Sequence, residues 1–363
     1  MYIGIPKERR IFEFRVGMTP SGVQMLTEAG HICYVEHEAG LGAGFSDLEY
    51  EQAGARIVYS AHEVFGRADL LLKVARPTLE ELEWMRPGTT IAGLLHLASS
   101  RREKIEMMKS KSLNAVAYEQ IQLKDGTVPV RKPLSMIGAS LAAQIGARLL
   151  QNDEGGRGVL MGGIAGVPPA EVVVIGAGVF GSHAAFACMK MGAHVTVLDI
   201  NLQTLQTVHE MFPGVVTLLA YPHNIARACA FADLVIAAVL VPGERPPIVV
   251  TRDMLRSMKP RSVIMDISID EGGCVETSRP TTHEKPTFIE EGIIHYCVPN
   301  IPSVVARTST YAFLNAAFPF IMQIANQGIH KAVATDPALE LGVAILDGEE
   351  RHLAQIKGIE EDQ

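Results

Sequence analysis

Short apolar runs alternate with polar stretches of helical period from residue 1 to about residue 130. The runs YIGIP, ICYVE, DLLLKV, TIAGLLHL and NAVAYE have the length and near-continuous hydrophobicity of buried strands. Between them, Thr19 can cap a helix that has Pro20 in its first turn, and Ser46 with Glu49 forms a capping box. Buried strands joined by helices predict a parallel sheet covered on both faces, so this segment is expected to be an α/β unit.

The strongest motif follows a stretch rich in glycine and proline, residues 153–170. EVVVIGAGVFGSHAAFACMKMGAHVTVLDI is typical of a strand, a G-x-G-x-x-G turn, a helix and a second strand. Gly176 permits the tight turn, Gly178 lets the backbone approach a pyrophosphate, and Gly181 allows close packing of helix and strand. Asp199 suits the ribose hydroxyls and no arginine follows it, so the motif predicts a dinucleotide site that prefers NAD to NADP.

Two further apolar runs, ADLVIAAVLVPG and RSVIMDISIDEGGC, continue this second α/β unit. Ligands of open α/β sheets bind beyond the carboxyl ends of the strands, so Val239, Leu240 and Asp270 are expected on the cofactor edge. Asp266 and Asp270 could instead be metal ligands. The neighbourhood offers no third ligand, and we therefore predict no metal site.

Composition narrows the class of protein. A chain of 363 residues exceeds the usual size of one domain, so two are expected. A net charge of -8 without a basic stripe disfavours nucleic-acid binding. The 5 cysteines are scattered without a CxxC pair, which favours a reducing compartment over disulfides or zinc. With no signal-peptide pattern and no apolar run long enough for a membrane, we expect a cytoplasmic protein whose partner is a small molecule.

Several segments together closely resemble the alanine dehydrogenases. They are GIPKERRIFEFRVGMTP, LLHLASSR, GGRGVLMGGIAGVPPAEVVVIGAG, DISIDEGGCVETSRPTTHEKPTF and ARTSTYAFLNAAFP, and the resemblance extends from residue 1 to about residue 345. Some of these motifs are shared with the NAD-binding subunit of nicotinamide nucleotide transhydrogenase. The resemblance implies two Rossmann-like domains with mainly parallel sheets. A discontinuous substrate domain, residues 1–132 and 308–363, would contain the inserted NAD domain, residues 133–307.

The same resemblance implies NAD-dependent oxidative deamination of L-alanine to pyruvate and ammonium, or the reverse amination, by a homohexamer. Arg15 and Lys73 would bind the substrate carboxylate or carbonyl oxygen, His96 and Asp270 would be the catalytic acid/base groups, and Asn300 would contact substrate and nicotinamide. The implied cofactor-binding set is Ser135, Gly176, Gly178, Val179, Gly181, Asp199, Val239, Leu240, Ile267, Asp270, Arg279, Val298 and Asn300.

Four of these residues also have a structural interpretation. His96 stands in the apolar run GLLHLASS, which is predicted to be a buried strand, and a histidine there is more often a core residue than a catalytic one. Arg15 and Arg279 could be surface charges, and Ser135 could cap a helix. Lys73 favours the functional interpretation, because an ammonium at the end of a buried strand is costly unless it meets an anion.

The chain departs from the family pattern in places that bear on substrate choice. Ala75 and Arg76 stand where the family usually has Lys-Glu, Met136 replaces a glutamate, and Glu271 replaces a glutamine beside Asp270. Small changes in a pocket alter substrate preference by about 1–3 kcal/mol. The alternatives to alanine deamination are therefore a dehydrogenase for another small 2-amino acid and an NAD(H)-binding paralogue without turnover.

Overall fold

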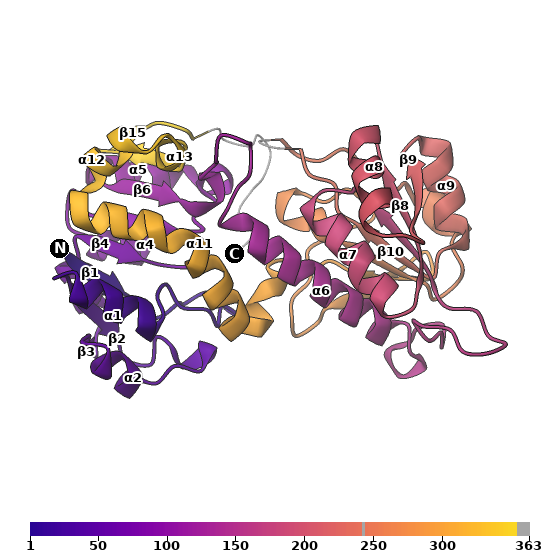
Figure 1. The fold of residues 1–363 in the computed structure, drawn as a ribbon, viewed down its shortest axis with the longest axis horizontal. Helices are drawn as coiled ribbons and strands as arrows, with labels where there is room; N and C mark the ends of the chain where they lie inside the picture. Colours follow the sequence, from indigo (N-terminus) through magenta and orange to yellow (C-terminus); the bar gives the residue numbers. More distant parts are fainter. Residues whose placement is uncertain (242–243, 354–363) are drawn as a thin grey trace. The chain divides into compact units, whose positions relative to one another are not determined.

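The computed structural model describes residues 1–241 and 244–353, and the chain divides into two compact units (Figure 1). Unit 1 combines Met1–Leu134 with the C-terminal segment that begins at Pro302. Unit 2 is the intervening segment Ser135–Ile301. No helix in the described part of the chain is long and apolar enough to cross a membrane.

In its described residues, unit 1 contains one sheet with the strand order β15-β14-β6-β5-β4-β1-β2-β3. The six strands of the N-terminal segment are parallel, whereas β14 pairs antiparallel with β6 and β15 antiparallel with β14. The strands are β1 (Tyr2–Ile5), β2 (Ile32–Glu36), β3 (Arg56–Val58), β4 (Leu70–Leu72), β5 (Thr90–Gly93), β6 (Asn114–Ala117), β14 (Val343–Leu346) and β15 (Glu349–Glu350).

Helices cover both faces of this sheet and bury two apolar clusters. One cluster includes Val23 of α1 and Phe313 of α11, and the other includes Phe65 of α3 and Ile105 of α5. The helices are α1 (Pro20–Glu28), α2 (Asp47–Gln52), α3 (Ala61–Arg67), α4 (Leu79–Trp84), α5 (Arg102–Ser110), α11 (Ala306–Gln327), α12 (Ile329–Thr335) and α13 (Pro337–Leu341). Both predicted caps are confirmed, because Thr19 accepts the N–H of Gly22 and a capping box precedes α2.

Unit 2 contains a second sheet, in the order β12-β13-β11-β10-β7-β8-β9, whose strands are parallel except for β12. They are β7 (Glu171–Ile175), β8 (His194–Asp199), β9 (Val216–Leu219), β10 (Leu234–Ala237), β11 (Val263–Asp266), β12 (Thr287–Glu290) and β13 (Ile293–Tyr296). The chain moves outward from β7 to β9 and then returns to β10 on the other side of β7. The gap between β7 and β10 is therefore a topological switch point, where α/β proteins bind ligands.

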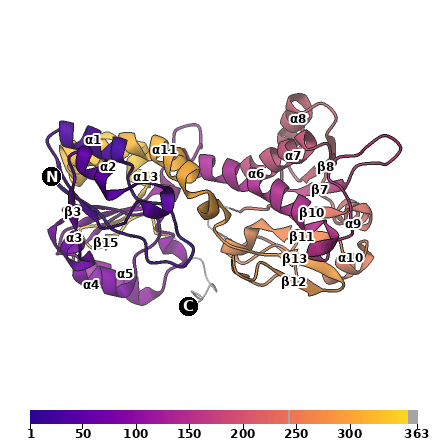
Figure 2. The ribbon, with the colours of Figure 1, turned by 90° about the horizontal axis from the view of Figure 1, so that it is seen from below.

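The helices of unit 2 lie on both faces of its sheet, as Figure 2 shows. Residues of α6 (Arg131–Leu149), α7 (Val179–Lys190) and α8 (Leu202–Met211) pack in one apolar cluster, and those of α9 (Pro222–Phe231) and α10 (Arg252–Ser257) pack in another. The predicted α/β class with two mainly parallel, Rossmann-like sheets is confirmed.

One predicted strand is too long. TIAGLLHL was expected to form a single buried strand containing His96, but β5 ends at Gly93 and His96 is an exposed residue in left-handed backbone, with φ 42°. The chain leaves the sheet because the backbone N–H groups of Leu95 and His96 are bound by the carboxylate of Glu119 instead of a neighbouring strand.

Candidate functional site

The glycine turn after β7 has the close contacts that the motif predicts. A Cβ on Gly176 would come within 2.3 Å of the Ala238 carbonyl oxygen, and one on Gly181 within 1.7 Å of the Gly176 carbonyl oxygen. Gly176 also has φ +97°, a conformation that favours glycine. A Cβ on Gly178 would meet nothing within 4 Å, so this glycine leaves open the surface that the turn presents.

The turn leads into the N-terminus of α7, a helix of 12 residues that begins at Val179 without a side-chain cap. Its first N–H groups and its dipole favour an anion, such as the pyrophosphate of a dinucleotide. Asp199, at the end of β8, ties the turn down, because its Oδ2 accepts the N–H of Ala177 at 2.7 Å. Its Oδ1 accepts the N–H of Asn201 at 2.8 Å, which holds the start of α8 beside the turn.

The other predicted cofactor residues of unit 2 gather at the carboxyl ends of its strands. Val239 and the exposed Leu240 follow β10, Ile267 follows β11, and Val298 and Asn300 follow β13. The Ser268 hydroxyl joins two of these loops, because it donates a hydrogen bond of 2.7 Å to the Val239 carbonyl oxygen.

Arg279 and Ser135 are placed differently from the residues at these strand ends. The exposed guanidinium of Arg279 lies 3.9 Å from the centre of the Phe288 ring and 3.6 Å from a Glu290 oxygen, at the β12 edge. Ser135 stands inside α6, which begins at Arg131, so the alternative interpretation of Ser135 as a helix cap is wrong.

The two aspartates of the loop after β11 have separate roles. Asp266 is buried, and its carboxylate accepts the N–H groups of Ser268, Cys274 and Val275 at 2.9–3.1 Å. It therefore shapes the loop that carries Asp270. Asp270 is exposed, and its Oδ2 accepts the Asn300 N–H at 3.4 Å. Over residues 1–241 and 244–353, no group of three His, Cys, Asp or Glu side chains could hold a metal ion.

In unit 1, hydrogen bonds between backbone N–H groups and Glu119 hold the loop that carries His96. The N–H of His96 donates to Glu119 Oε1 at 2.5 Å, and the N–H of Leu95 donates to Glu119 Oε2 at 3.1 Å. The surrounding protein lowers the pKa of His96 by desolvating the imidazolium, and nearby guanidinium groups, that of Arg76 first, lower it further. Because His96 is exposed, water weakens the effect of these guanidinium groups. Desolvation and the positive charges nevertheless all lower the pKa. At neutral pH His96 is thus a neutral imidazole that can accept a proton.

Arg15 lies in the segment that follows β1, and it is buried rather than on the surface. Its Nε and Nη2 donate to the two carboxylate oxygens of Glu13 at 2.7 and 2.6 Å, a bidentate pair that fixes the plane of the guanidinium. The same segment contacts the end of β4, because a Cβ on Gly17 would come within 2.0 Å of the Leu72 carbonyl oxygen. Arg15 is therefore placed at the carboxyl edge of this sheet.

Lys73 follows β4 at the same edge, and its ammonium is buried between two carboxylates. Lys73 Nζ is 3.1 Å from Glu8 Oε2 and 3.0 Å from Glu81 Oε1. Burial lowers the pKa of Lys73, but the two carboxylates more than offset this effect, so its pKa lies above the usual value. The anion that a buried Lys73 needs is thus already supplied within unit 1.

Unit 1 therefore collects Arg15, Lys73 and His96 at the carboxyl ends of β1, β4 and β5, and unit 2 collects Asp270, Asn300 and the glycine turn at the carboxyl ends of its own strands. Sequence reasoning missed the carboxylates that organise the first group, Glu8, Glu13, Glu81 and Glu119. A signal existed for Glu119, which directly follows a predicted strand. Glu13 stands two residues from its partner Arg15, and Glu81 follows Thr78 at capping-box spacing, so both had a local signal, whereas nothing local indicates the pair of Glu8 with Lys73.

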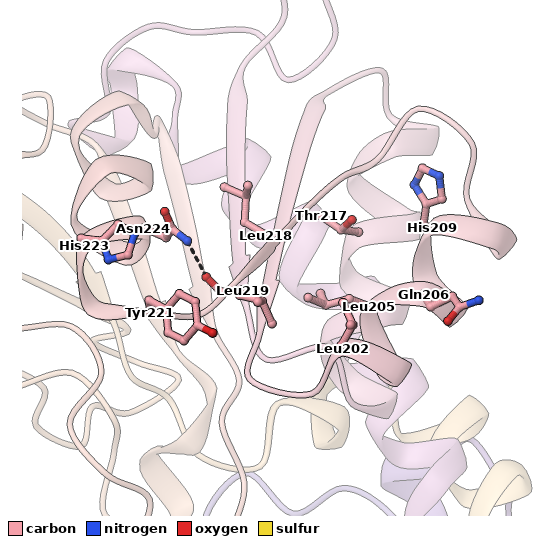
Figure 3. A pocket seen from close by; sticks show the side chains of 10 residues that line it. All are labelled: Leu202, Leu205, Gln206, His209, Thr217, Leu218, Leu219, Tyr221, His223 and Asn224. Carbon is pink, nitrogen blue, oxygen red and sulfur yellow. Dashed lines mark hydrogen bonds between the residues drawn. The ribbon is translucent and has the colours of Figure 1, made fainter.

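Two surface pockets of unit 2 differ in their relation to this site. One is lined by residues of α8, β9 and α9 and contains none of the predicted site residues (Figure 3). In it the Asn224 side chain donates a hydrogen bond of 2.9 Å to the Leu219 carbonyl oxygen. The other adjoins the glycine turn, since Ala177, Ser182 and Asn201 are among its lining residues.

Fold and site together define a two-unit α/β protein with a dinucleotide-type glycine turn in unit 2. Comparison with models of known protein families identifies the family to which the chain belongs. Residues 4–138 match the model "Alanine dehydrogenase/PNT, N-terminal domain", and residues 142–352 match "Alanine dehydrogenase/PNT, C-terminal domain". The chain belongs to the alanine dehydrogenase/PNT family, which confirms the resemblance inferred from its motifs.

Individual relatives agree with this assignment. The alanine dehydrogenase of Methanococcus maripaludis is 44% identical over 98% of this chain and 96% of its own length. That of Mycolicibacterium smegmatis is 45% identical over 96% of this chain and 94% of its own length. Among solved structures, an L-alanine dehydrogenase matches with a TM-score of 0.93 and 43% identity over 97% of both chains. A transhydrogenase from Sinorhizobium meliloti matches with a TM-score of 0.81 and 26% identity over 97% of this chain and 99% of its own.

Proposed function

We propose that the protein catalyses the NAD-dependent oxidative deamination of L-alanine to pyruvate and ammonium, and the reverse amination. The observation that carries the proposal is the grouping of Arg15, Lys73 and His96 at one sheet edge of unit 1, in a chain whose near full-length relatives are alanine dehydrogenases. Two cations suit a carboxylate, and a neutral imidazole beside them suits proton transfer at the neighbouring carbon.

NAD is the cofactor that we propose for unit 2. The open face of Gly178 and the uncapped start of α7 fit a pyrophosphate, and the carboxylate of Asp199 fits ribose hydroxyls better than a 2′-phosphate. When bound, the nicotinamide would accept a hydride from the substrate Cα. Val239, Leu240, Ile267, Val298 and Asn300 would border the cofactor at the strand ends, with Ser135, Val179 and Arg279 as further contacts.

The proposed division of labour follows from the chemistry of each side chain. Arg15 and Lys73 would hold the substrate carboxylate, and Asn300 would help to orient substrate and nicotinamide. His96 would accept a proton from the water that adds to the oxidised substrate carbon, pass it to the substrate nitrogen, and then accept the hydroxyl proton as ammonia leaves. The carboxylate of Asp270 would stabilise the cationic nitrogen. In the reverse direction the same groups would return these protons. Residues 1–132 and 308–363 would form the substrate domain, and residues 133–307 the NAD domain.

We also propose that the protein works in the cytoplasm as a homohexamer, by analogy with its family. Its partners would be L-alanine, pyruvate and ammonium. The family resemblance and the net charge of -8 support small-molecule partners rather than nucleic acid.

A related small 2-amino acid is the second candidate substrate, and Arg76 is the observation that favours it. The positive charge of its guanidinium lowers the pKa of His96. Its Nη1 lies 3.4 Å from the hydroxyl oxygen of Ser99, in the turn that begins at His96. A positive charge at this position, where the family usually has a glutamate, changes the electrostatic potential around the substrate side chain and hence the preferred substrate.

The decisive assay is NADH oxidation in the presence of ammonium, with pyruvate, glyoxylate and 2-oxobutyrate compared as substrates. Pyruvate is expected to give the highest kcat/KM. A higher kcat/KM for another 2-oxo acid would show that the substrate is the corresponding amino acid and not alanine. NADH binding without any turnover would refute the enzyme proposal. The His96→Ala variant is expected to bind NADH normally and to lose about 10²–10⁴-fold in kcat.

A further inference from the structure

Arginine side chains surround His96 from neighbouring loops of unit 1. The strands β6, β5, β4 and β1 are adjacent and parallel, so the loops at their carboxyl ends share one edge of the sheet. The residues at this edge are Arg10 and Arg15 after β1, Arg76 after β4, His96 after β5, and Arg131 at the start of α6, the α-helix that follows β6. The topology therefore gathers basic side chains from segments that are far apart in the chain.

Two of these arginines act on groups that hold the turn beginning at His96. Arg76 Nη1 lies 3.4 Å from the Ser99 hydroxyl oxygen, and that hydroxyl donates to the His96 carbonyl oxygen at 3.1 Å. Glu119 binds the His96 N–H, and the positive charge of Arg131 opposes the rise in the pKa of Glu119 that burial causes. Arg76 is thus linked to the His96 backbone through one hydroxyl, and Arg131 acts on the carboxylate that holds the same backbone.

Positive charge exceeds negative charge around His96 within unit 1. Guanidinium groups lower the pKa of His96, in the order Arg76, Arg131, Arg10 and Arg15. The carboxylates beside them are Glu13, which pairs with Arg15 at 2.6 Å, and Glu119, whose pKa burial raises to about 7. Glu119 is therefore only partly ionised at neutral pH. Four guanidinium groups thus outnumber these two carboxylates.

The charges around Lys73 balance separately. Its ammonium is 1% exposed and lies 3.1 Å from Glu8 Oε2 and 3.0 Å from Glu81 Oε1. Arg9 lies 3.5 Å from the same Glu81 oxygen, so two cations face two carboxylates in this cluster. The excess of positive charge at the sheet edge is accordingly due to the arginines around His96.

A substrate with a single carboxylate would leave most of this excess without a counter-charge. Arg15, buried and fixed by Glu13, is the group proposed for that carboxylate. Arg76 and Arg131 are half-buried, which limits the screening of their charges by water, and Arg10 is exposed. A guanidinium binds a carboxylate through two parallel hydrogen bonds, and complementary charge selects the partner that carries it. The chemistry that suits this edge is a second carboxylate on the substrate side chain.

We infer that Arg10, Arg76 and Arg131 form a second anion subsite beside His96, which binds the side-chain carboxylate of a dicarboxylic 2-amino acid. The inference rests on the proposed function, in which Arg15 binds the first carboxylate and His96 transfers protons at the reacting carbon. The reaction itself is unchanged, because the side-chain carboxylate neither gains nor loses a bond. The three arginines of the subsite thus determine which amino acid the protein prefers.

Matched pairs of amino acids test the subsite in the full-length protein. L-Glutamate is compared with L-norvaline, and L-aspartate with L-2-aminobutyrate, since the members of each pair have the same chain length and differ by a carboxylate in place of a methyl group. Initial rates of NAD reduction give kcat/KM, and calorimetry with the NADH-saturated protein gives a Kd that needs no turnover. In at least one pair the acidic member is expected to have a kcat/KM at least about tenfold higher and a Kd at least about tenfold lower.

Substitution of the subsite arginines should remove this preference. Arg131→Gln and Arg10→Gln are each expected to lower the ratio of kcat/KM between the acidic and the neutral member of the preferred pair by about fivefold or more. The ratio is the informative quantity, because a change in the pKa of His96 affects both members alike. Arg131→Lys keeps the positive charge and should lose less of the preference than Arg131→Gln. The control is Arg67→Gln, which removes an exposed guanidinium paired with Glu63 in α3, a helix that ends just before β4 begins and so lies toward the opposite edge of the sheet.

The outcomes separate the subsite from the reaction. No preference for the acidic member of either pair, in kcat/KM or in Kd, would overturn the subsite even if L-alanine is oxidised. An unchanged ratio in both Arg131→Gln and Arg10→Gln, or an equal fall in Arg67→Gln, would overturn it as well, because the preference would then come from a general attraction of anions. Failure to oxidise L-alanine or any of these amino acids would refute the proposed function, and the Kd ratios would still decide the subsite.

Discussion

Glu119 accepts hydrogen bonds from the backbone N–H groups of Leu95 and His96, and it thereby holds His96 in left-handed backbone. Hydrogen bonds to a charged group contribute about 1.5–3 kcal/mol each. We expect Glu119→Gln, whose single amide oxygen can accept only one of the two N–H groups, to lower kcat about 10- to 100-fold while the Kd for NADH is unchanged. Steady-state kinetics and NADH titration measure the two quantities.

The pH dependence of the same variant separates positioning from a general loss of stability. Burial raises the pKa of Glu119 to about 7, so the unaltered protein protonates this carboxyl as pH falls through that value and its acceptor strength declines. A fall in kcat below about pH 7 should therefore disappear in Glu119→Gln, which does not titrate. Glu106→Gln, an exposed change in a pair with Arg102, serves as the control. An unchanged kcat in Glu119→Gln would show that the two bonds do not matter for catalysis.

Arg76 is expected to keep His96 unprotonated at acidic pH. After desolvation, its positive charge is the largest influence that lowers the pKa of His96. Arg76→Gln removes this charge and stabilises the imidazolium, so the pKa of His96 should rise and less neutral base should remain at low pH. In the Glu119→Gln background, which lacks the fall near pH 7, the remaining acidic limb of the kcat/KM profile for alanine should then move to higher pH. The exposed Arg102→Gln should leave that limb in place, and an unmoved limb in Arg76→Gln would contradict the prediction.

Whole elements were predictable where the signal is local. The cap at Thr19 and the capping box of Ser46 and Glu49 depend on residues within one helical turn, and both are present. The end of β5 was not predictable from hydrophobicity, because Leu95 and Leu97 beyond the strand are as buried as the strand itself. A buried loop at a sheet edge and a buried strand give the same apolar pattern.

Gly178, in the turn between β7 and α7, and Gly181, in the first turn of α7, should respond differently to the same substitution. Gly181→Ala forces a Cβ against the Gly176 carbonyl oxygen, so α7 must shift, and we expect a loss of about 1–3 kcal/mol in the stability of unit 2. Gly178→Ala meets no protein atom, so stability should change by less than about 0.5 kcal/mol. Its methyl group would nevertheless stand where the pyrophosphate approaches, and NADH affinity should fall at least about tenfold. Thermal unfolding and NADH titration test the pair, and unchanged NADH affinity in Gly178→Ala would place the cofactor elsewhere.

At the scale of the molecule, the sequence pattern indicates the α/β class and the glycine turn, because each repeats a short signal. The return of the chain to the first sheet has no such signal. The run VAIL of β14 is one more short apolar segment, and its antiparallel pairing with β6 depends on residues such as Val116 and Val343 that are far apart in the chain. Glu8 was missed for the same reason, since it reaches Lys73 from a distant part of the chain, whereas Glu81 lies in the helix that follows Lys73. The roles of Arg15, Lys73 and His96 came from the family resemblance rather than from the pattern.

Because the C-terminal segment completes unit 1, a core substitution in this segment should destabilise unit 1 and leave unit 2 folded. Ala344 is fully buried in β14, so Ala344→Asp places an unpaired carboxylate in the core of unit 1 at a cost of at least about 3 kcal/mol. We expect the variant to lose turnover of pyruvate with ammonium and to unfold at a lower temperature. NADH binding should persist within about twofold, because the glycine turn and Asp199 belong to unit 2, whose core contains no residue of β14. Ala334→Asp makes the same chemical change at an exposed position of α12 and should leave both properties unaltered. Loss of NADH binding in Ala344→Asp, with Ala334→Asp unaffected, would show that the two units do not fold independently.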